Sequence, residues 1–355
     1  MLKLNSEQLI AIWSQLSGHD SNLALQLASA EQWQSVTAPI PSMPVDYLWP
    51  VTQYYHQYNL SYANEAIFLP IVLTQQQQVI AIWPVNLVLT YNGWQLQSNS
   101  GPLLCPLFLS SHLSLSSRKK IIKRCITWLI EIAHGCHIKQ VQACQLSYFD
   151  SDPNWALTWM SHGASLDSQY ESLVDLTMSP NQYKKHITKG ALADIKKALN
   201  LWRYEYVTHM SETQRDKFAA LHLNAAGKVT RSKESWESQR QLINQGVSFA
   251  IFAYDELDSL IGAAQFIYGH GFSTYAFAAY DRSLFKLPIA HGAQQLAMDF
   301  LKQRGMSCYL LGQRCFAGES PPPTPKERSI GDFKSSFATD YQLKHIFSLA
   351  IMKDH

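Results

Sequence analysis

VSFAIFAYDELDSLIGAAQFIYGHGFSTYAFAAYDRSLFKLPIAHGAQQLAMDFLKQRGMSCYLLGQR, residues 247–314, carries the order of elements from which the fold can be inferred. Three apolar runs, separated by the turns DELDS and GHG, predict an antiparallel meander of three strands. The segment IAHGAQQLAMDFLKQRG then predicts a helix, because Leu296, Phe300 and Leu301 share one face and Gly305 suits its end. MSCYLLG predicts a buried closing strand.

Two stretches carry a resemblance to a known family. The passage YDRSLFKLPIAHGAQQLAMDFLKQRGMSCYLLG (280–312), followed after a loop by FKSSFA (333–338), resembles the FemAB-like acyltransferases of the acyl-CoA N-acyltransferase (GNAT) superfamily. The resemblance is clearest in the C-terminal half. It implies an α/β (α+β) fold of two tandem GNAT-like domains, each a mixed, mostly antiparallel sheet flanked by helices.

The first half of the chain repeats this order of elements with little residue identity. AIFLPIVLTQQQQVIAIWPVNLVLTYNGWQLQSNS (66–100) predicts three strands, and Asn92-Gly93 is a strong hairpin signal. A helix over SRKKIIKRCITWLIEIAHG (117–135) and a strand over HIKQVQACQL (137–146) follow. We therefore predict a degenerate N-terminal domain over residues 1–165 and an acyltransferase domain over 166–355. Chance recurrence of common elements is the alternative.

Two further segments carry structural predictions. SVTAPIPSMPVDYLWPV (35–51) contains four prolines, which predicts an extended connection. SPNQYKKHITKGALADIKKALNL (179–201) predicts one long helix with Ser179 as its cap and Pro180 at its first position. Its lysines, Lys185 among them, can contact a nucleotide-sugar diphosphate, a lipid head group or tRNA. A solvated helix face is the alternative.

The bulk composition excludes several classes of protein. The 355 residues, 46% apolar and 16% charged, indicate compact globular domains, and the net charge of +2 provides no overall footprint for nucleic acid. The six cysteines lack CxxC spacing and the 13 histidines lack HExxH, which predicts reduced thiols and no metal. The sequence contains neither a signal-peptide pattern nor a run of about 18 apolar residues. These features predict a cytoplasmic protein without a membrane span.

The resemblance assigns donor binding to the start of the 289–303 helix. In GNAT enzymes the phosphates of acyl-CoA bind backbone N–H groups at the equivalent helix N-terminus. Carried over, the cofactor-binding residues are Lys286, Ile289, Ala290, His291 and Gly292. The Q/R-x-x-G-x-G/A signature of the coenzyme A-binding relatives is absent, since only Gly292 is in place. An ordinary loop and helix cap is the alternative reading.

Three residues are candidates for catalysis. Lys334 matches the lysine of an F-K-x-x-F-G context that lies beside the active cleft in the family, although Ala338 replaces the glycine. A cation there can polarise the donor carbonyl. Tyr280 and Asp281 end the third strand, and Asp281 can accept the proton of an attacking amine. A solvated lysine and a turn aspartate are the alternatives.

Two residues are candidates for substrate binding. Arg231 matches an arginine that precedes the meander in this family, and it suits bidentate capture of phosphate or carboxylate. A surface ion pair with Glu234 is the alternative. Lys185, on the basic helix, is the second candidate.

The resemblance implies direct transfer of an acyl or aminoacyl group to an amine of a cell-envelope or glycan precursor, such as an amino sugar or a peptidoglycan peptide. Direct attack needs orientation and oxyanion stabilisation, and no covalent intermediate on the enzyme. Acyl-CoA is the expected donor, and aminoacyl-tRNA, used by FemAB enzymes proper, is the alternative. A non-catalytic binding protein with the same fold is a further alternative.

Overall fold

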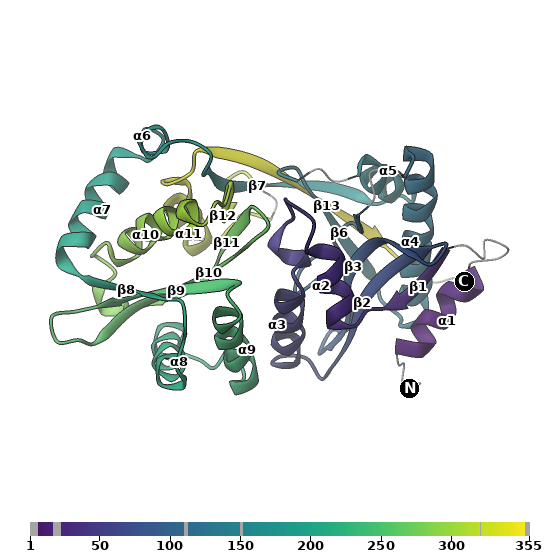
Figure 1. Cartoon of the computed structure of the whole chain (residues 1–355), viewed down its shortest axis with the longest axis horizontal. Helices are drawn as coiled ribbons and strands as arrows, with labels where there is room; N and C mark the ends of the chain where they lie inside the picture. Colours follow the sequence, from purple (N-terminus) through teal and green to yellow (C-terminus); the bar gives the residue numbers. More distant parts are fainter. Residues whose placement is uncertain (1–5, 17–22, 110–112, 150–151, 320, 352–355) are drawn as a thin grey trace. The chain divides into compact units, whose positions relative to one another are not determined.

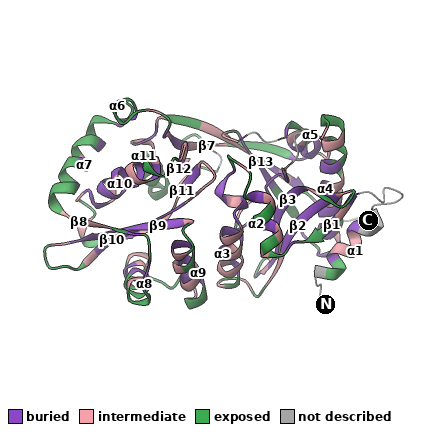
Figure 2. Ribbon diagram, in the orientation of Figure 1, coloured by how far each residue is buried: buried purple, intermediate pink, exposed green. Residues whose placement is uncertain are grey.

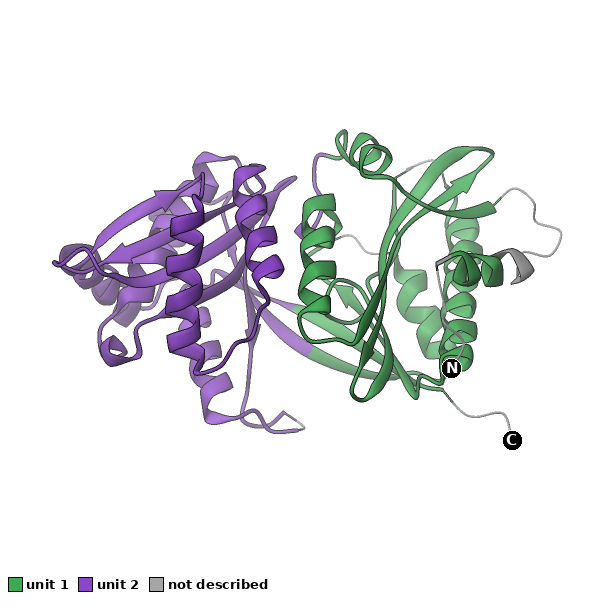
Figure 3. Ribbon diagram, turned by 90° about the horizontal axis from the view of Figure 1, so that it is seen from below, with its two compact units in different colours: residues 1–40, 46–168, 343–355 green, residues 41–45, 169–342 purple. Residues whose placement is uncertain are grey.

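The computed structural model describes residues 6–16, 23–109, 113–149, 152–319 and 321–351. The chain divides into two compact units (Figure 3). Unit 1 comprises Met1–Ile40, Asp46–Ser168 and Leu343–His355, and unit 2 comprises Pro41–Val45 and Gln169–Gln342.

The first half of the chain builds a five-stranded sheet in the order β1-β2-β3-β4, with β5 on β3. Gln76 and Gln77, both with positive φ, make the tight turn between β2 and β3. The hairpin predicted between β3 and β4 forms through the two-residue turn Tyr91-Asn92, and Gly93, also with positive φ, is the first residue of β4. The elements are α1 (Ser6–Leu16), β1 (Leu23–Leu27), α2 (Ala30–Thr37), η1 (Val45–Tyr47), α3 (Trp49–Leu60), β2 (Glu65–Gln75), β3 (Gln78–Thr90), β4 (Gly93–Gln97), β5 (Leu107–Phe108), α4 (Leu115–Gly135), β6 (Gln140–Leu146), α5 (Pro153–Ser161) and β7 (Ser165–Asp175).

The second half repeats this succession of elements (Figure 1). In each half a strand is followed by two α-helices, three strands, a helix, a strand, a helix and a last strand. This succession runs from β1 to β7 and from β8 to β13, if the two-residue β5 and the 3₁₀ turns η1 and η2 are left out. The predicted repetition is therefore confirmed. The elements are α6 (Pro180–Tyr183), α7 (Lys189–Leu201), β8 (Arg203–Val207), α8 (Glu212–Ala226), α9 (Lys233–Asn244), β9 (Ser248–Tyr254), β10 (Leu260–Gly269), β11 (Phe272–Tyr280), η2 (Arg282–Leu284), α10 (Ile289–Gln303), β12 (Cys308–Arg314), α11 (Pro325–Ser335) and β13 (Asp340–Ala350).

Each unit contains the last strand of the other repeat. From Gln169 onward β7 belongs to unit 2, where it pairs antiparallel with β12. From Leu343 onward β13 belongs to unit 1, where it pairs antiparallel with β6. The predicted domains, 1–165 and 166–355, are contiguous in sequence and do not include this exchange of strands.

The strands β9 and β10 of unit 2 are buried on both faces along most of their length (Figure 2). One face packs against α7 and α10 through a core that includes Ile195, Phe266 and Met298. The other packs against α8 and α9 through a core that includes Phe218 and Trp236. Because successive residues of a strand point to opposite faces, the two-sided burial explains why β9 and β10 are apolar almost throughout.

Two predictions about local structure are wrong. The expected long helix over 179–201 is interrupted between Tyr183 and Lys189, because Thr188 starts a new helix by accepting a hydrogen bond from the Ala191 N–H. The expected extended connection over 35–51 gives way to α3 at Trp49. Pro50 lies in the first turn of α3, where its missing N–H costs nothing.

Glu237 on α9 pairs with two arginines, Arg215 of α8 and Arg240 of its own helix. Its carboxylate accepts hydrogen bonds from the buried Arg215 at 2.6 Å and from Arg240 at 2.5 Å. The hydrogen bonds from Arg240, and then those from Arg215, lower the pKa of Glu237 to about 2. The contribution of Glu237 to stability is complete above its ordinary pKa of about 4.5 and is lost as the pH falls toward 2.

We expect Glu237→Gln to lower the free energy of unfolding at pH 7 by about 2 kcal/mol, because the variant removes one of the two carboxylates that pair with the buried Arg215 guanidinium and leaves it with Asp216, whose side chain is 68% exposed. Urea unfolding between pH 7 and pH 3 measures this, and the loss between wild type and variant should shrink on acidification. Glu256→Gln, in an exposed turn, is the matched control and should be neutral. If Glu237→Gln lowered the free energy of unfolding equally at pH 7 and pH 3, the ionised Glu237 carboxylate would not be the source of the stability.

Candidate functional site

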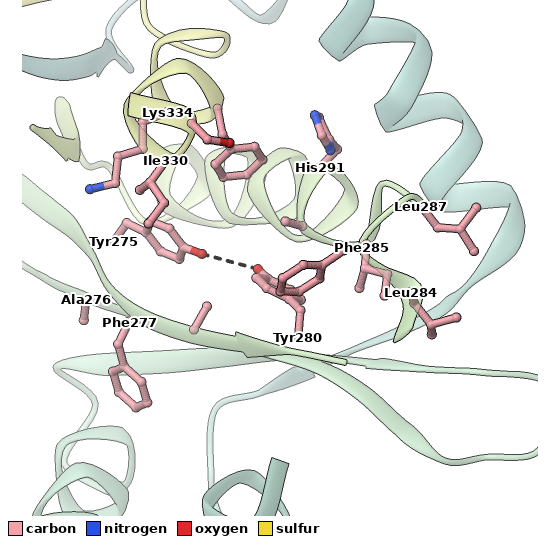
Figure 4. Close-up of a pocket in the computed structure, with 15 residues that line it drawn as sticks. Tyr275, Ala276, Phe277, Tyr280, Leu284, Phe285, Leu287, His291, Ile330 and Lys334 are labelled. Atoms are coloured by element: carbon pink, nitrogen blue, oxygen red, sulfur yellow. Dashed lines mark hydrogen bonds between the residues drawn. The ribbon is translucent and has the colours of Figure 1, made fainter. Parts of the chain in front are cut away.

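A pocket of about 490 Å³ opens in unit 2 where two parallel strands separate. β11 pairs with β12 only from Phe272 to Thr274, opposite Cys308 to Leu310. Beyond Thr274 no described strand pairs with this edge of β11, and the pocket is lined by β11, the loop after it, the first turn of α10, and α11 (Figure 4). The separation therefore leaves one edge of β11 facing the pocket.

A β-bulge places two tyrosines on the wall of this pocket. Residues 275 and 280 are an odd number apart, so a regular strand would point them to opposite faces. The register with β10 shifts between Gln265 and Phe266, opposite Ala276, and the extra residue restores Tyr275 and Tyr280 to one side. Their hydroxyl oxygens lie 3.4 Å apart, whereas Phe277 points to the other side of β11 (Figure 4).

Burial keeps both phenols protonated. It raises the pKa of Tyr275 to about 12 and that of Tyr280 well above its ordinary value of 10, and the neighbouring phenol raises the latter further. Two neutral hydroxyls therefore face the pocket, and each can donate a hydrogen bond. Tyr280, a predicted site residue, lies in the pocket, and Tyr275 is an additional one.

Lys334 reaches the same pocket from α11. Its ammonium lies over Gly312 of β12, at a second irregularity in the sheet where β12 shifts register against β7. Gly312 has φ of 105°, and a side chain there would collide with the lysine, so only glycine fits both demands. Burial lowers the pKa of the Lys334 amine, and the Glu171 carboxylate on β7 offsets part of this.

His291 lines the pocket from the first turn of α10. Its ring packs against Phe333 and Phe337, with centroids 5.1 Å and 5.5 Å away, and its Nε2 lies 3.6 Å from the Asp194 carboxylate. Burial lowers the pKa of His291, and Asp194 opposes this. The ring is therefore neutral at pH 7 and can accept a proton.

The residues expected to bind donor phosphates fit a phosphate poorly. Ile289 and Ala290 line the pocket, but the N–H groups of Ile289 and His291 donate to loop carbonyls of Leu287 and Pro288. Gly292 is buried under the Tyr204 ring, whose hydroxyl donates to the Ile289 carbonyl at 2.8 Å. The glycine thus makes room for an aromatic side chain of this protein. Lys286 is exposed and does not line the pocket.

Asp281, Arg231 and Lys185 lie outside this pocket. Asp281 borders a second pocket, of about 450 Å³, beside α8, and its carboxylate accepts hydrogen bonds from the N–H and hydroxyl of Ser283. Lys185 is exposed between α6 and α7. The structure therefore brings Lys334, Tyr280, Ile289, Ala290 and His291 together and separates the other predicted residues from them.

Arg231 packs against the opposite face of the sheet. Its guanidinium lies 4.5 Å from the ring centroid of Phe277, and it donates a 3.0 Å hydrogen bond to Nε2 of His222. Burial, and then the arginine charge, lower the pKa of His222 to about 4, which leaves the ring neutral and able to accept that bond. Its role in substrate binding remains a prediction.

Sequence reasoning missed Tyr275, Tyr204, Gly312 and Glu171. Bulges and the separation of strands depend on pairing across the sheet, so no local pattern marks Tyr275 as facing the pocket. Glu171 enters unit 2 on the last strand of the first repeat. Gly312, a glycine directly after an apolar run, was the one local signal of an irregular strand.

The described residues contain no group of three or more His, Cys, Asp or Glu side chains arranged to hold a metal ion. None of the described helices is both long and apolar enough to cross a bilayer.

Two α/β units with the same succession of elements, and a pocket where the parallel strands β11 and β12 separate, define the fold. Among similar solved structures, FemX has a TM-score of 0.66 at 10% identity, over 91% of this chain and 96% of its own. L-PGS from Bacillus licheniformis has a TM-score of 0.57 at 10% identity, over 93% and 94%. A tandem GNAT protein from the clavulanic acid biosynthesis pathway has a TM-score of 0.53 at 9% identity, over 94% and 100%.

No protein-family model and no curated protein matches the sequence. The structural likenesses show that the chain has the FemAB-like tandem GNAT fold, which confirms the fold predicted from the sequence. At identities near 10% they show the fold alone, so the reaction has to be inferred from the pocket.

We expect Gly292→Ala to destabilise the protein by about 2 kcal/mol, because its Cβ would overlap the Tyr204 ring. In a Tyr204→Ala background the same substitution should cost much less, and a double-mutant cycle of urea unfolding measures the coupling. Gly190→Ala, on an α7 position with open space around it, is the control and should be neutral or slightly stabilising. Equal costs of Gly292→Ala in both backgrounds would overturn this account.

Proposed function

We propose that unit 2 is an N-acyltransferase that moves an acyl group from a thioester donor to an amine of a cell-envelope or glycan precursor. The observation that carries the proposal is the pocket at the separation of β11 and β12, which combines one partly desolvated lysine with two protonated phenols. Direct transfer needs such donors around the carbonyl oxygen, which becomes negative during the reaction.

Each step is assigned to groups that line the pocket. The amine nitrogen attacks the donor carbonyl carbon, and the new oxyanion is stabilised by the Lys334 ammonium and the Tyr280 hydroxyl. When the carbonyl re-forms, the carbon–sulfur bond breaks and the thiolate leaves, to be protonated by solvent. The nitrogen gives its proton to the neutral ring of His291. Asp281 keeps its predicted role as an alternative base only if the acceptor enters from the α8 side.

The charges of the pocket favour a simple acyl group over an aminoacyl group. Among the described residues that line it, Lys334 is the one fixed cation, and no aspartate or glutamate is present. The α-ammonium of an aminoacyl donor would therefore meet a like charge without a carboxylate partner.

Aminoacyl-tRNA is a second candidate donor because exposed lysines lie along α7. Lys189, Lys196 and Lys197 are exposed on α7, where they can contact a polyanion. The experiment below includes both kinds of donor. A protein that binds glycans without transfer would show binding and no product with either.

We expect Lys334→Met to lower kcat/KM by about 10²-fold or more, because it removes a charge that acts on the transition state. Release of free thiol from a panel of acyl-CoA donors, with glucosamine and peptidoglycan peptides as acceptors, measures transfer, and mass spectrometry of charged tRNA tests the second donor. Tyr280→Phe should lose activity as well, and Tyr91→Phe, at an exposed turn, should not. Unchanged transfer by Lys334→Met would refute the assignment.

The pH dependence of stability distinguishes a catalytic role of Lys334 from a structural role. The folded pKa of Lys334 lies below its ordinary value of 10.5, so burial of its charge is unfavourable at neutral pH and wild-type stability rises with pH between the two values. Lys334→Met should therefore be at least as stable as the wild type at pH 7 and should lack this rise. Thermal melts from pH 7 to pH 10 measure the difference.

A further inference from the structure

The N-terminus of α10 offers little to a phosphate group. Two of its first amides already donate to the carbonyls of Leu287 and Pro288, and Tyr204 covers Gly292. Ala290 is the remaining first-turn residue that lines the pocket. One backbone amide is far fewer contacts than a diphosphate needs for binding at a helix N-terminus.

The loop before α10 gives the mouth of the pocket an apolar character. Leu284, Phe285 and Leu287 come from this loop and Ile330 comes from α11, and all four line the pocket (Figure 4). Phe285 is 67% exposed and Ile330 is 43% exposed. Lys286, between two of these apolar residues, is exposed away from the lining. A charged phosphate would lose its hydration against these four apolar side chains without gaining a partner among them.

The pocket itself matches an uncharged arm that contains both amide and methylene groups. Its volume of about 490 Å³ lies within the range of pockets that hold small organic ligands. Beyond Thr274 the edge of β11 that faces away from β10 pairs with no described strand, so amide groups of an extended ligand can pair with it there. The hydroxyl of Ser329 adds a further neutral partner.

We infer that the donor is recognised through an uncharged thioester-bearing arm in this pocket, and that phosphate or nucleotide groups beyond the arm contribute no affinity at α10. The inference rests on the proposed function. It adds a statement about the carrier, the part of the donor molecule that lies beyond the arm. The enzyme accepts acyl groups equally well from any carrier that ends in such an arm, whether the carrier is a nucleotide or a larger molecule.

Binding of two unreactive thioether probes tests the inference. S-hexyl-pantetheine has the arm alone, and S-hexyl-coenzyme A has the same arm with its phosphates and nucleotide. Isothermal titration should give Kd values within about threefold of each other, and 3′,5′-adenosine diphosphate should not bind measurably. A coenzyme A probe that binds tenfold or more tightly than the pantetheine probe overturns the inference, and so does failure of both probes to bind.

Three variants locate the binding. Ile330→Glu places a carboxylate at the apolar mouth and should weaken both probes by tenfold or more. Lys286→Ala should leave both Kd values unchanged, and selective weakening of the coenzyme A probe would show that its phosphates are recognised. Leu257→Glu, at a residue 86% exposed outside the pocket, is the matched control for an added surface charge.

The outcome is independent of transfer activity. If the probes bind as expected and thiol release is absent with every acceptor, the proposed reaction fails while the mode of recognition stands. If thiol release depends on Lys334 and the coenzyme A probe binds far more tightly, the reaction stands and the inference fails.

Discussion

β11 and β12 of unit 2 form a parallel pair over three residues and then separate, and the site follows from that separation. A strand edge inside a protein has to find partners for its N–H and C=O groups. On its other edge β11 pairs with β10 at every residue except the bulged Ala276, so the strand is held in place while its unpaired edge is open to a ligand. The helices α10 and α11 supply the other walls of the pocket.

Two irregularities in the sheet complete the arrangement. The bulge at Ala276 turns Tyr275 and Tyr280 to the same side, and the shift at Gly312 admits the Lys334 amine beside β12. Both irregularities interrupt the regular ladder next to the pocket, and both direct a polar side chain toward it. Bulges are often found beside functional sites for this reason.

Sequence patterns were sufficient for the three-stranded meander and the helix after it, and insufficient for the helices within 35–51 and 179–201 and for the pocket. Apolar runs between turn residues marked β9, β10 and β11 because local periodicity and turn chemistry coincide there. Gly292 shows the limit: a glycine at a helix start suits a phosphate and suits an aromatic ring equally, and only the position of Tyr204 decides between them. Lys334 was found through the family motif, and its neighbour Glu171 is 163 residues earlier in the chain.

The same element carries different chemistry in the two repeats, as the helices α4 and α10 show. In unit 1 the side chain of Ser114 caps α4 by accepting a hydrogen bond from the Ser117 N–H, so that helix start is satisfied by an ordinary cap. In unit 2 the corresponding cap residue is Pro288, which has no side-chain acceptor, and the loop carbonyls take its place. A proline cap places no polar cap side chain beside the first turn, where Leu287 and Ile289 line the pocket. The apolar mouth of the pocket in unit 2 therefore begins with the choice of residue at the start of a single helix.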